Sequence, residues 1–74
     1  MNIAEKEALF TKVEKLLSLK PKTVAQVEAY HELEWLGYVL YVSLNVHFVP
    51  TNVITDALPQ IQADINLVFG EGTM

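Results

Sequence analysis

The chain has 74 residues, a formal net charge of −4 at pH 7 and no cysteine. A chain this short forms one domain that buries only about 60% of the surface of its unfolded state, and without cysteine it has no disulfide or thiolate metal site to add stability. Of the residues, 51% are apolar, which is more than the interior of so small a domain can bury. We therefore expect part of the apolar surface to face a partner, and we predict a homodimer.

The charges are distributed unevenly along the chain. All five lysines lie between Lys6 and Lys22, and the rest of the chain carries carboxylates but no Lys or Arg. Nucleic acids and anionic membrane surfaces are bound mainly through Lys and Arg, so we expect neither as a partner. The longest apolar segment, residues 35–49, is also shorter than the roughly 20 residues that span a bilayer. Residues 1–7 lack the features of a secretory signal, so we expect a cytoplasmic protein.

The first predicted helix covers residues 3–19. Asn2 is a suitable N-cap, and Glu5 follows it at the spacing of a capping box. Pro21 ends the helix because a proline and the residue before it both disfavour continuation. One apolar stripe runs along this helix at three- and four-residue spacing and comprises Leu9, Phe10, Val13, Leu16 and Leu17.

The second predicted helix covers residues 24–47 and is the longest. Thr23 and Gln26 have the spacing of a second capping box, and Pro50 sets the outer limit. A helix of this length spans on the order of 35 Å. Residues 42–48 also alternate between apolar and polar side chains, so a strand that pairs across a dimer remains an alternative for this segment.

The second helix has two apolar stripes when its residues are placed at 100° intervals. The first stripe, which we expect to face the core, comprises Tyr30, Leu33, Gly37, Leu40, Tyr41, Leu44 and Phe48. The second comprises Val27, Trp35, Tyr38, Val42, Val46 and Val49, with His31 among them. A helix that is apolar on opposite sides must be covered on both, so we predict that the second stripe is the seam of the dimer. The partner-binding residues that we predict are Val27, His31, Trp35, Tyr38, Val42 and Val46.

The third predicted helix covers residues 55–69. Either Thr55 or Asp56 as N-cap places Pro59 in the first turn, whereas Thr51 as N-cap would place the proline inside the helix. Glycines follow the apolar pattern, and we expect residues 70–74 to be frayed. The apolar positions of this helix are Ile54, Leu58, Ile61, Ile65, Val68 and Phe69. The predicted fold is therefore all-α, a small three-helix bundle with a long central helix.

The densest group of titratable residues lies in the second helix. Glu28, His31 and Glu34 are one turn apart, and helix bundles with di-iron centres use Glu-x-x-His motifs from two helices. Here the order is His-x-x-Glu and it occurs once, so we expect a solvated acidic face and no metal. The chain also lacks a nucleophile elbow and a phosphate-binding glycine loop, which predicts no enzymatic activity and no cofactor.

Trp35 and Tyr38 are the strongest functional candidates because Trp and Tyr dominate binding hot spots. With carboxylates around them they match the usual anatomy of a protein interface. We therefore predict a non-catalytic protein-binding regulator, such as an adaptor, a chaperone-like protein or an inhibitor. Two alternatives remain at this stage. One is an acidic mimic of nucleic acid that blocks a DNA- or RNA-binding protein, and the other is a small-ligand or metal site around His31 at a dimer interface.

Overall fold

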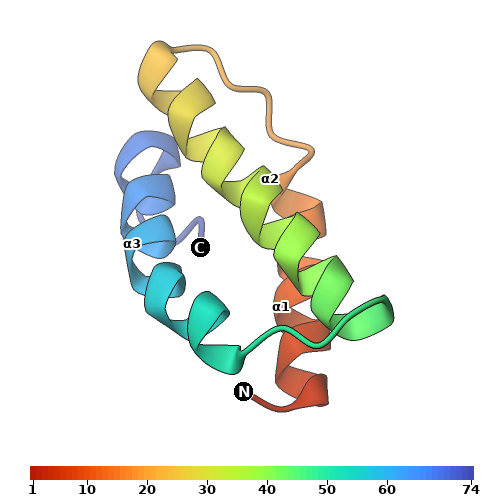
Figure 1. The fold of residues 1–74 in the computed structure, drawn as a ribbon. Coiled ribbons are helices and arrows are strands. Elements are labelled where there is room, and N and C mark those ends of the chain that lie inside the picture. Colours follow the sequence, from red (N-terminus) through yellow and green to blue (C-terminus); the bar gives the residue numbers. More distant parts are fainter.

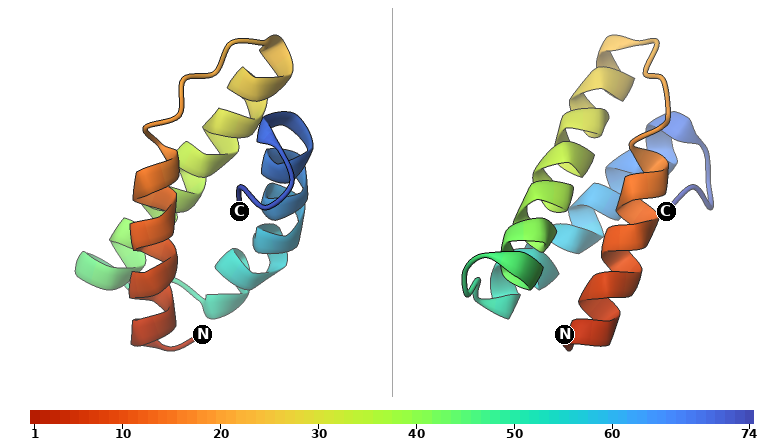
Figure 2. Two further views of the ribbon diagram at one scale, coloured as in Figure 1. Left: turned by 180° about the vertical axis from the view of Figure 1, so that it is seen from behind. Right: turned by 90° about the vertical axis from the view of Figure 1, so that its right-hand side faces the viewer.

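The computed structural model covers residues 1–74 and contains three α-helices, α1 (Ile3–Leu16), α2 (Val24–Asn45) and α3 (Thr51–Phe69). The central helix α2 is the longest, and both α1 and α3 pack against it (Figure 1). Figure 2 shows that α1 and α3 lie on the same side of α2. The prediction of an all-α chain with three packed helices is confirmed. None of the three helices is both long enough and apolar enough to cross a membrane.

The N-termini of α1 and α2 are closed by side-chain caps. Glu5 N–H donates to Asn2 Oδ1 over 2.8 Å and Asn2 N–H donates to Glu5 Oε1 over 3.1 Å, as predicted. At α2, Gln26 N–H donates to Thr23 Oγ1 over 3.1 Å. The reciprocal bond predicted for Gln26 is not formed, because Gln26 Oε1 accepts from the Lys22 N–H over 2.8 Å and not from the Thr23 N–H. The Gln26 side-chain amide donates to the Val68 carbonyl over 2.9 Å. This bond satisfies a carbonyl at the C-terminal end of α3, where helices leave carbonyls without partners.

The first helix ends earlier than predicted. It stops at Leu16, three residues before the expected end at residue 19, because the chain must leave the helical conformation ahead of Pro21. The Leu17 carbonyl, which the helix no longer uses, accepts a hydrogen bond from the Tyr30 hydroxyl over 2.7 Å. This bond joins the C-terminal end of α1 to the middle of the bundle.

The second helix ends at Asn45, two residues before the expected position. The N–H groups of Val46 and His47 both donate to the Val42 carbonyl, over 3.0 and 2.9 Å, and this closes the last turn. The strand alternative for residues 42–48 is therefore wrong, since the first four of these residues are helical and the others form the turn. Extended backbone follows, as the residue before Pro50 requires.

The third helix starts at Thr51 and not at residue 55, so Pro59 lies inside the helix. The expectation that the proline falls in the first turn is wrong. The hydrogen bond that Pro59 cannot donate would go to the Thr55 carbonyl, and both residues are exposed, so solvent can reach this carbonyl. The early start brings Ile54 into the core, where it is fully buried. Burial of this side chain offsets the cost of the proline.

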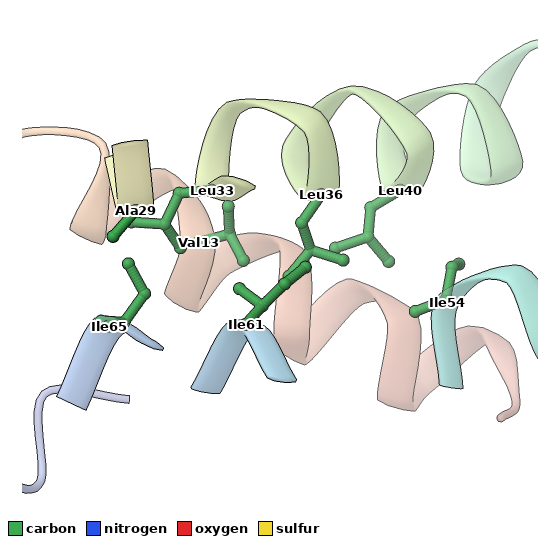
Figure 3. Packing of buried hydrophobic residues seen from close by; sticks show 8 residues of the cluster. All are labelled: Val13, Ala29, Leu33, Leu36, Leu40, Ile54, Ile61 and Ile65. Atoms are coloured by element: carbon green, nitrogen blue, oxygen red, sulfur yellow. The ribbon is translucent and has the colours of Figure 1, made fainter. Parts of the chain in front are cut away.

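The core lies where the three helices meet and contains no buried polar side chain. Leu33 and Leu40 of the predicted stripe are fully buried, whereas Tyr41 and Phe48 are exposed. Because α1 and α3 contact different flanks of α2, the buried arc is wider than one stripe and also includes Leu36. The buried apolar residues, all shown in Figure 3, are Val13, Ala29, Leu33, Leu36, Leu40, Ile54, Ile61 and Ile65.

Gly37 marks the close approach of α1 to α2. A Cβ atom at this position would lie 3.4 Å from Val13 Cγ1 and 3.6 Å from Leu17 Cδ1. The two helices therefore pack with almost no space between them at this point. Leu36 and Gly37 both face inward, so Trp35 and Tyr38 on either side of them are directed outward by the 100° rotation between successive residues.

The C-terminal tail, predicted to be frayed, folds back between α1 and α3 in the structure (Figure 1). Gly70 and Gly72 have positive φ angles of 122° and 83°, which glycine adopts readily. Met74 N–H donates to Asn66 Oδ1 over 2.7 Å, and the Met74 carbonyl accepts from Lys12 Nζ over 3.0 Å. The Met74 side chain packs against the core.

Candidate functional site

The six residues predicted to bind a partner lie on the side of α2 that faces away from the core, and we call this surface the outer face. Trp35 is 42% exposed and Tyr38 is 68% exposed, so both present apolar surface to solvent. Val27 and Val46 are exposed by 40% and 55%, and Val42 is half-buried. The core is filled without these residues. The outer face comprises Val27, His31, Trp35, Tyr38, Val42 and Val46.

His31 is the polar member of the outer face. Its Nδ1 lies 2.7 Å from Glu34 Oε1, and both side chains are well exposed. An exposed pair of this kind contributes little to stability. No group of three or more His, Cys, Asp or Glu side chains is placed to hold a metal ion. His31 is thus an exposed hydrogen-bonding group among the apolar residues of the outer face.

Three further polar residues, Ser43, Asn45 and His47, lie near the C-terminal end of α2. The Ser43 hydroxyl accepts a hydrogen bond from Lys6 Nζ over 2.8 Å, and the Asn45 side chain donates to the Tyr41 carbonyl over 3.2 Å. His47 is exposed in the turn that follows α2. The Ser43 hydroxyl thus accepts from Lys6 and joins the N-terminal part of α1 to the C-terminal part of α2.

A depression of about 400 Å³ lies between α2 and α3, beside the outer face, and we call it the α2–α3 groove. Trp35 and His31 belong to both the groove and the outer face. The α3 side contributes Ala57 and Ile61, which make much of the groove apolar, together with the amide of Gln60. The full set of lining residues is His31, Glu32, Trp35, Ala57, Gln60 and Ile61.

A second, smaller depression of about 200 Å³ continues along the same two helices toward the N-terminus of α2. Glu32 lines both depressions, so they meet at its carboxylate. Glu28 and Asp64 line the second depression, and Gln60 Nε2 donates to Asp64 Oδ1 over 2.8 Å. The ionisable side chains along the two depressions are three carboxylates and His31, and no lysine lines either one.

The carboxyl group of Glu32 is the most perturbed titratable group of the chain. Its pKa is raised from 4.5 to about 7. Partial burial is the largest cause, because it disfavours the charged form. The hydrogen bond to Asp64 and the negative charges of Asp64 and Glu28 raise the pKa further. Glu32 and Asp64 come from different helices, so protonation of Glu32 favours the packing of α3 against α2.

Folding stability should therefore fall as the pH rises from about 4.5 to about 7. In this pH range Glu32 of the folded chain keeps a proton that Glu32 of the unfolded chain has lost. The stability that this proton contributes is therefore complete below the pKa of the unfolded chain, 4.5, and absent above the pKa of the folded chain, about 7. Because Glu32 is partly exposed, we expect a loss of about 1 kcal/mol, or about 4–8 °C in melting temperature. Thermal melts followed by circular dichroism between pH 5 and pH 8 measure this shift.

The Glu32→Gln variant isolates the contribution of this carboxyl group. Its melting temperature should be nearly independent of pH in this range, after subtraction of the pH dependence that the other titratable groups cause. Glu14→Gln is the matched control, because Glu14 is an exposed carboxylate on α1 and its removal changes the net charge equally. An equal pH slope in wild type and Glu32→Gln would show that Glu32 does not hold the proton.

The outer face follows from the sequence pattern, but the α2–α3 groove was not predicted. Glu32 has the spacing of the solvated acidic face expected on the second helix, and no role was predicted for Ala57, Gln60 or Asp64. One signal was available, because Val53, Ala57, Gln60, Asp64 and Leu67 recur at spacings of four and three along one side of α3. That stripe mixes apolar and polar side chains, so the periodicity of the apolar residues alone does not reveal it.

Scans against protein-family models, curated proteins and solved structures found no match to this chain. Its fold and its exposed surface therefore carry the functional interpretation alone.

Proposed function

We propose that this chain is a non-catalytic protein-binding regulator that acts by presenting the outer face of α2 to another protein chain. The observation that carries this proposal is the exposure of Trp35 and Tyr38 on a helix whose opposite side already fills the core. Exposed aromatic side chains that the fold does not need are typical of binding surfaces. Adaptor, chaperone-like and inhibitory proteins all work by occupying a surface in this way.

The surroundings of the two aromatic residues favour a protein as the ligand. An apolar centre formed by Trp35, Tyr38 and Val42 is bordered by the polar side chains of His31 and Glu34. Protein interfaces have this arrangement of an apolar centre and a polar rim. Trp and Tyr also contribute large contact areas at a low cost in side-chain entropy.

The chemistry of the groove supports binding rather than nucleophilic catalysis. Neither depression between α2 and α3 is lined by a Ser, Thr or Cys side chain. The carboxylates that line them, with Glu28 and Asp64 next to Glu32, favour a partner with a basic or mixed surface. The five lysines of the chain lie in its first 22 residues, outside α2 and α3.

Replacement of Trp35 and Tyr38 together by Ala should abolish the binding of the partner. Loss of two hot-spot side chains costs about 2 kcal/mol or more, which weakens binding by roughly 30-fold or more. Capture from an extract of the source cell, with wild type and variant immobilised in parallel, measures the difference. Ile3→Ala serves as control, because Ile3 is a 67% exposed apolar side chain on α1. Proteins retained equally by all three chains would contradict the proposal.

A further inference from the structure

We propose that the outer face of α2 binds a second copy of this chain, with the two α2 helices antiparallel and the two-fold axis between Trp35 and Tyr38. This inference rests on the proposed function and deepens it, because it names the partner and the register of the contact. Three observations carry it, namely the spacing of the residues on the outer face, the distribution of charge along α2, and the groove beside Trp35.

The spacing of the outer face reads the same in both directions. Its six residues are separated by four, four, three, four and four positions. A two-fold axis through the middle of such a pattern places each residue opposite another member of the same set, as an isologous interface requires. The facing pairs are Trp35 with Tyr38, His31 with Val42, and Val27 with Val46. In this single register all six residues of the outer face lie in the contact between the two copies.

The charges on α2 select the antiparallel orientation. Glu28, Glu32 and Glu34 all lie in the N-terminal half of the helix, and residues 36–45 carry no charged side chain. Parallel helices would bring the three carboxylates of each copy together, with no lysine nearby to compensate. Antiparallel helices place the acidic half of one copy against the uncharged half of the other. They also oppose the two helix dipoles, which is the favourable arrangement.

The α2–α3 groove supplies a place for the most exposed aromatic residue of the outer face. Tyr38 is 68% exposed, and in the antiparallel register it faces Trp35 of the second copy, which lines a depression of about 400 Å³. A depression of this volume is large enough to take an aromatic ring. The polar groups of Glu32 and Gln60 line the same groove, where they can bond the tyrosine hydroxyl, as buried tyrosines require.

Cross-linking between introduced cysteines tests the orientation, and the absence of native cysteine makes each product unambiguous. Two chains are prepared, Val27→Cys and Val46→Cys, one of them with a tag that distinguishes the masses, and both are treated with a short bismaleimide. In the antiparallel register Val27 faces Val46, while the two copies of Val27 lie roughly 28 Å apart along the helices. We expect at least tenfold more covalent dimer from the mixture than from either chain alone.

Each result of this experiment decides the proposal. Efficient cross-linking of Val27→Cys to itself would show a parallel pair and overturn the inference. If the wild type sediments as a dimer but the mixture of Val27→Cys and Val46→Cys gives no cross-linked product, the proposed register is wrong. A monomer at high micromolar concentration would overturn self-association, whereas the capture experiment with Trp35 and Tyr38 would still decide the protein-binding function separately. Ile3→Cys mixed with Val46→Cys is the control and should give no specific product.

Discussion

The Leu40→Ala variant should lose about 2–5 kcal/mol of folding stability and melt roughly 10–30 °C below the wild type. Leu40 is fully buried and extends from α2 into the core shared with Leu36 and Ile54 (Figure 3). Its removal takes away apolar burial and leaves a cavity that the surrounding helices fill only in part. A domain of this size has a total stability on the order of 4–11 kcal/mol, so the change removes a large part of it.

Thermal and urea denaturation followed by helical circular dichroism measure this loss. Leu67→Ala is the matched control, because it makes the same deletion on α3 at a leucine that is 80% exposed. The control should stay within about 0.5 kcal/mol of the wild type, as surface substitutions usually do. Equal stability losses for the two variants would contradict the placement of Leu40 in the core and of Leu67 at the surface.

The elements of the fold follow largely from local signals in the sequence. Asn2 with Glu5 predicts the start of the first helix, and Thr23 predicts the start of the second, because an N-cap needs only the backbone that follows it. The proline at position 21 predicts the break between them. Leu33 and Leu40 are placed in the core by their spacing. These features depend on residues within two turns of each other, which a sequence shows directly.

The errors arise where contacts between helices decide the outcome. Leu36 and Ala29 are buried because α3 covers a second flank of α2, and the pattern of α2 alone does not give the direction from which α3 arrives. The start of α3 at Thr51 follows from burial of Ile54, which outweighs the unfavourable position of Pro59. Local propensity is a weak guide when tertiary burial opposes it.

The functional surface also has one part that the sequence predicts and one part that depends on contacts between helices. The spacing of Trp35 and Tyr38 places them on a side of α2 opposite the core, and the structure shows both exposed, while their role in binding stays a prediction. The α2–α3 groove depends on the approach of Ala57 and Gln60 of α3 to Glu32 of α2, and these residues are far apart in sequence. The raised pKa of Glu32 has the same origin, since burial and the neighbouring carboxylates exist only after the helices pack.

The Tyr38→Glu variant should be a folded monomer, with self-association weakened on the order of a hundredfold or more. Tyr38 is 68% exposed, so the substitution should disturb the isolated chain little. In the antiparallel dimer, however, the new carboxylate would enter the groove of the second copy beside Glu32, where no lysine can pair with it. A buried charge without a partner costs several kcal/mol, and each 1.4 kcal/mol is about a factor of ten in the dissociation constant.

Sedimentation of the wild type and the variant over a range of concentrations measures this change, and circular dichroism checks that the helices remain. Ile3→Glu is the control, because Ile3 is 67% exposed and lies on α1, away from the outer face. This control adds the same charge and should associate as the wild type does. If Tyr38→Glu sediments as a dimer with the affinity of the wild type, Tyr38 lies outside the contact. The groove beside Trp35 would then remain open to a different protein. If that protein binds the outer face, Tyr38→Glu should weaken its binding.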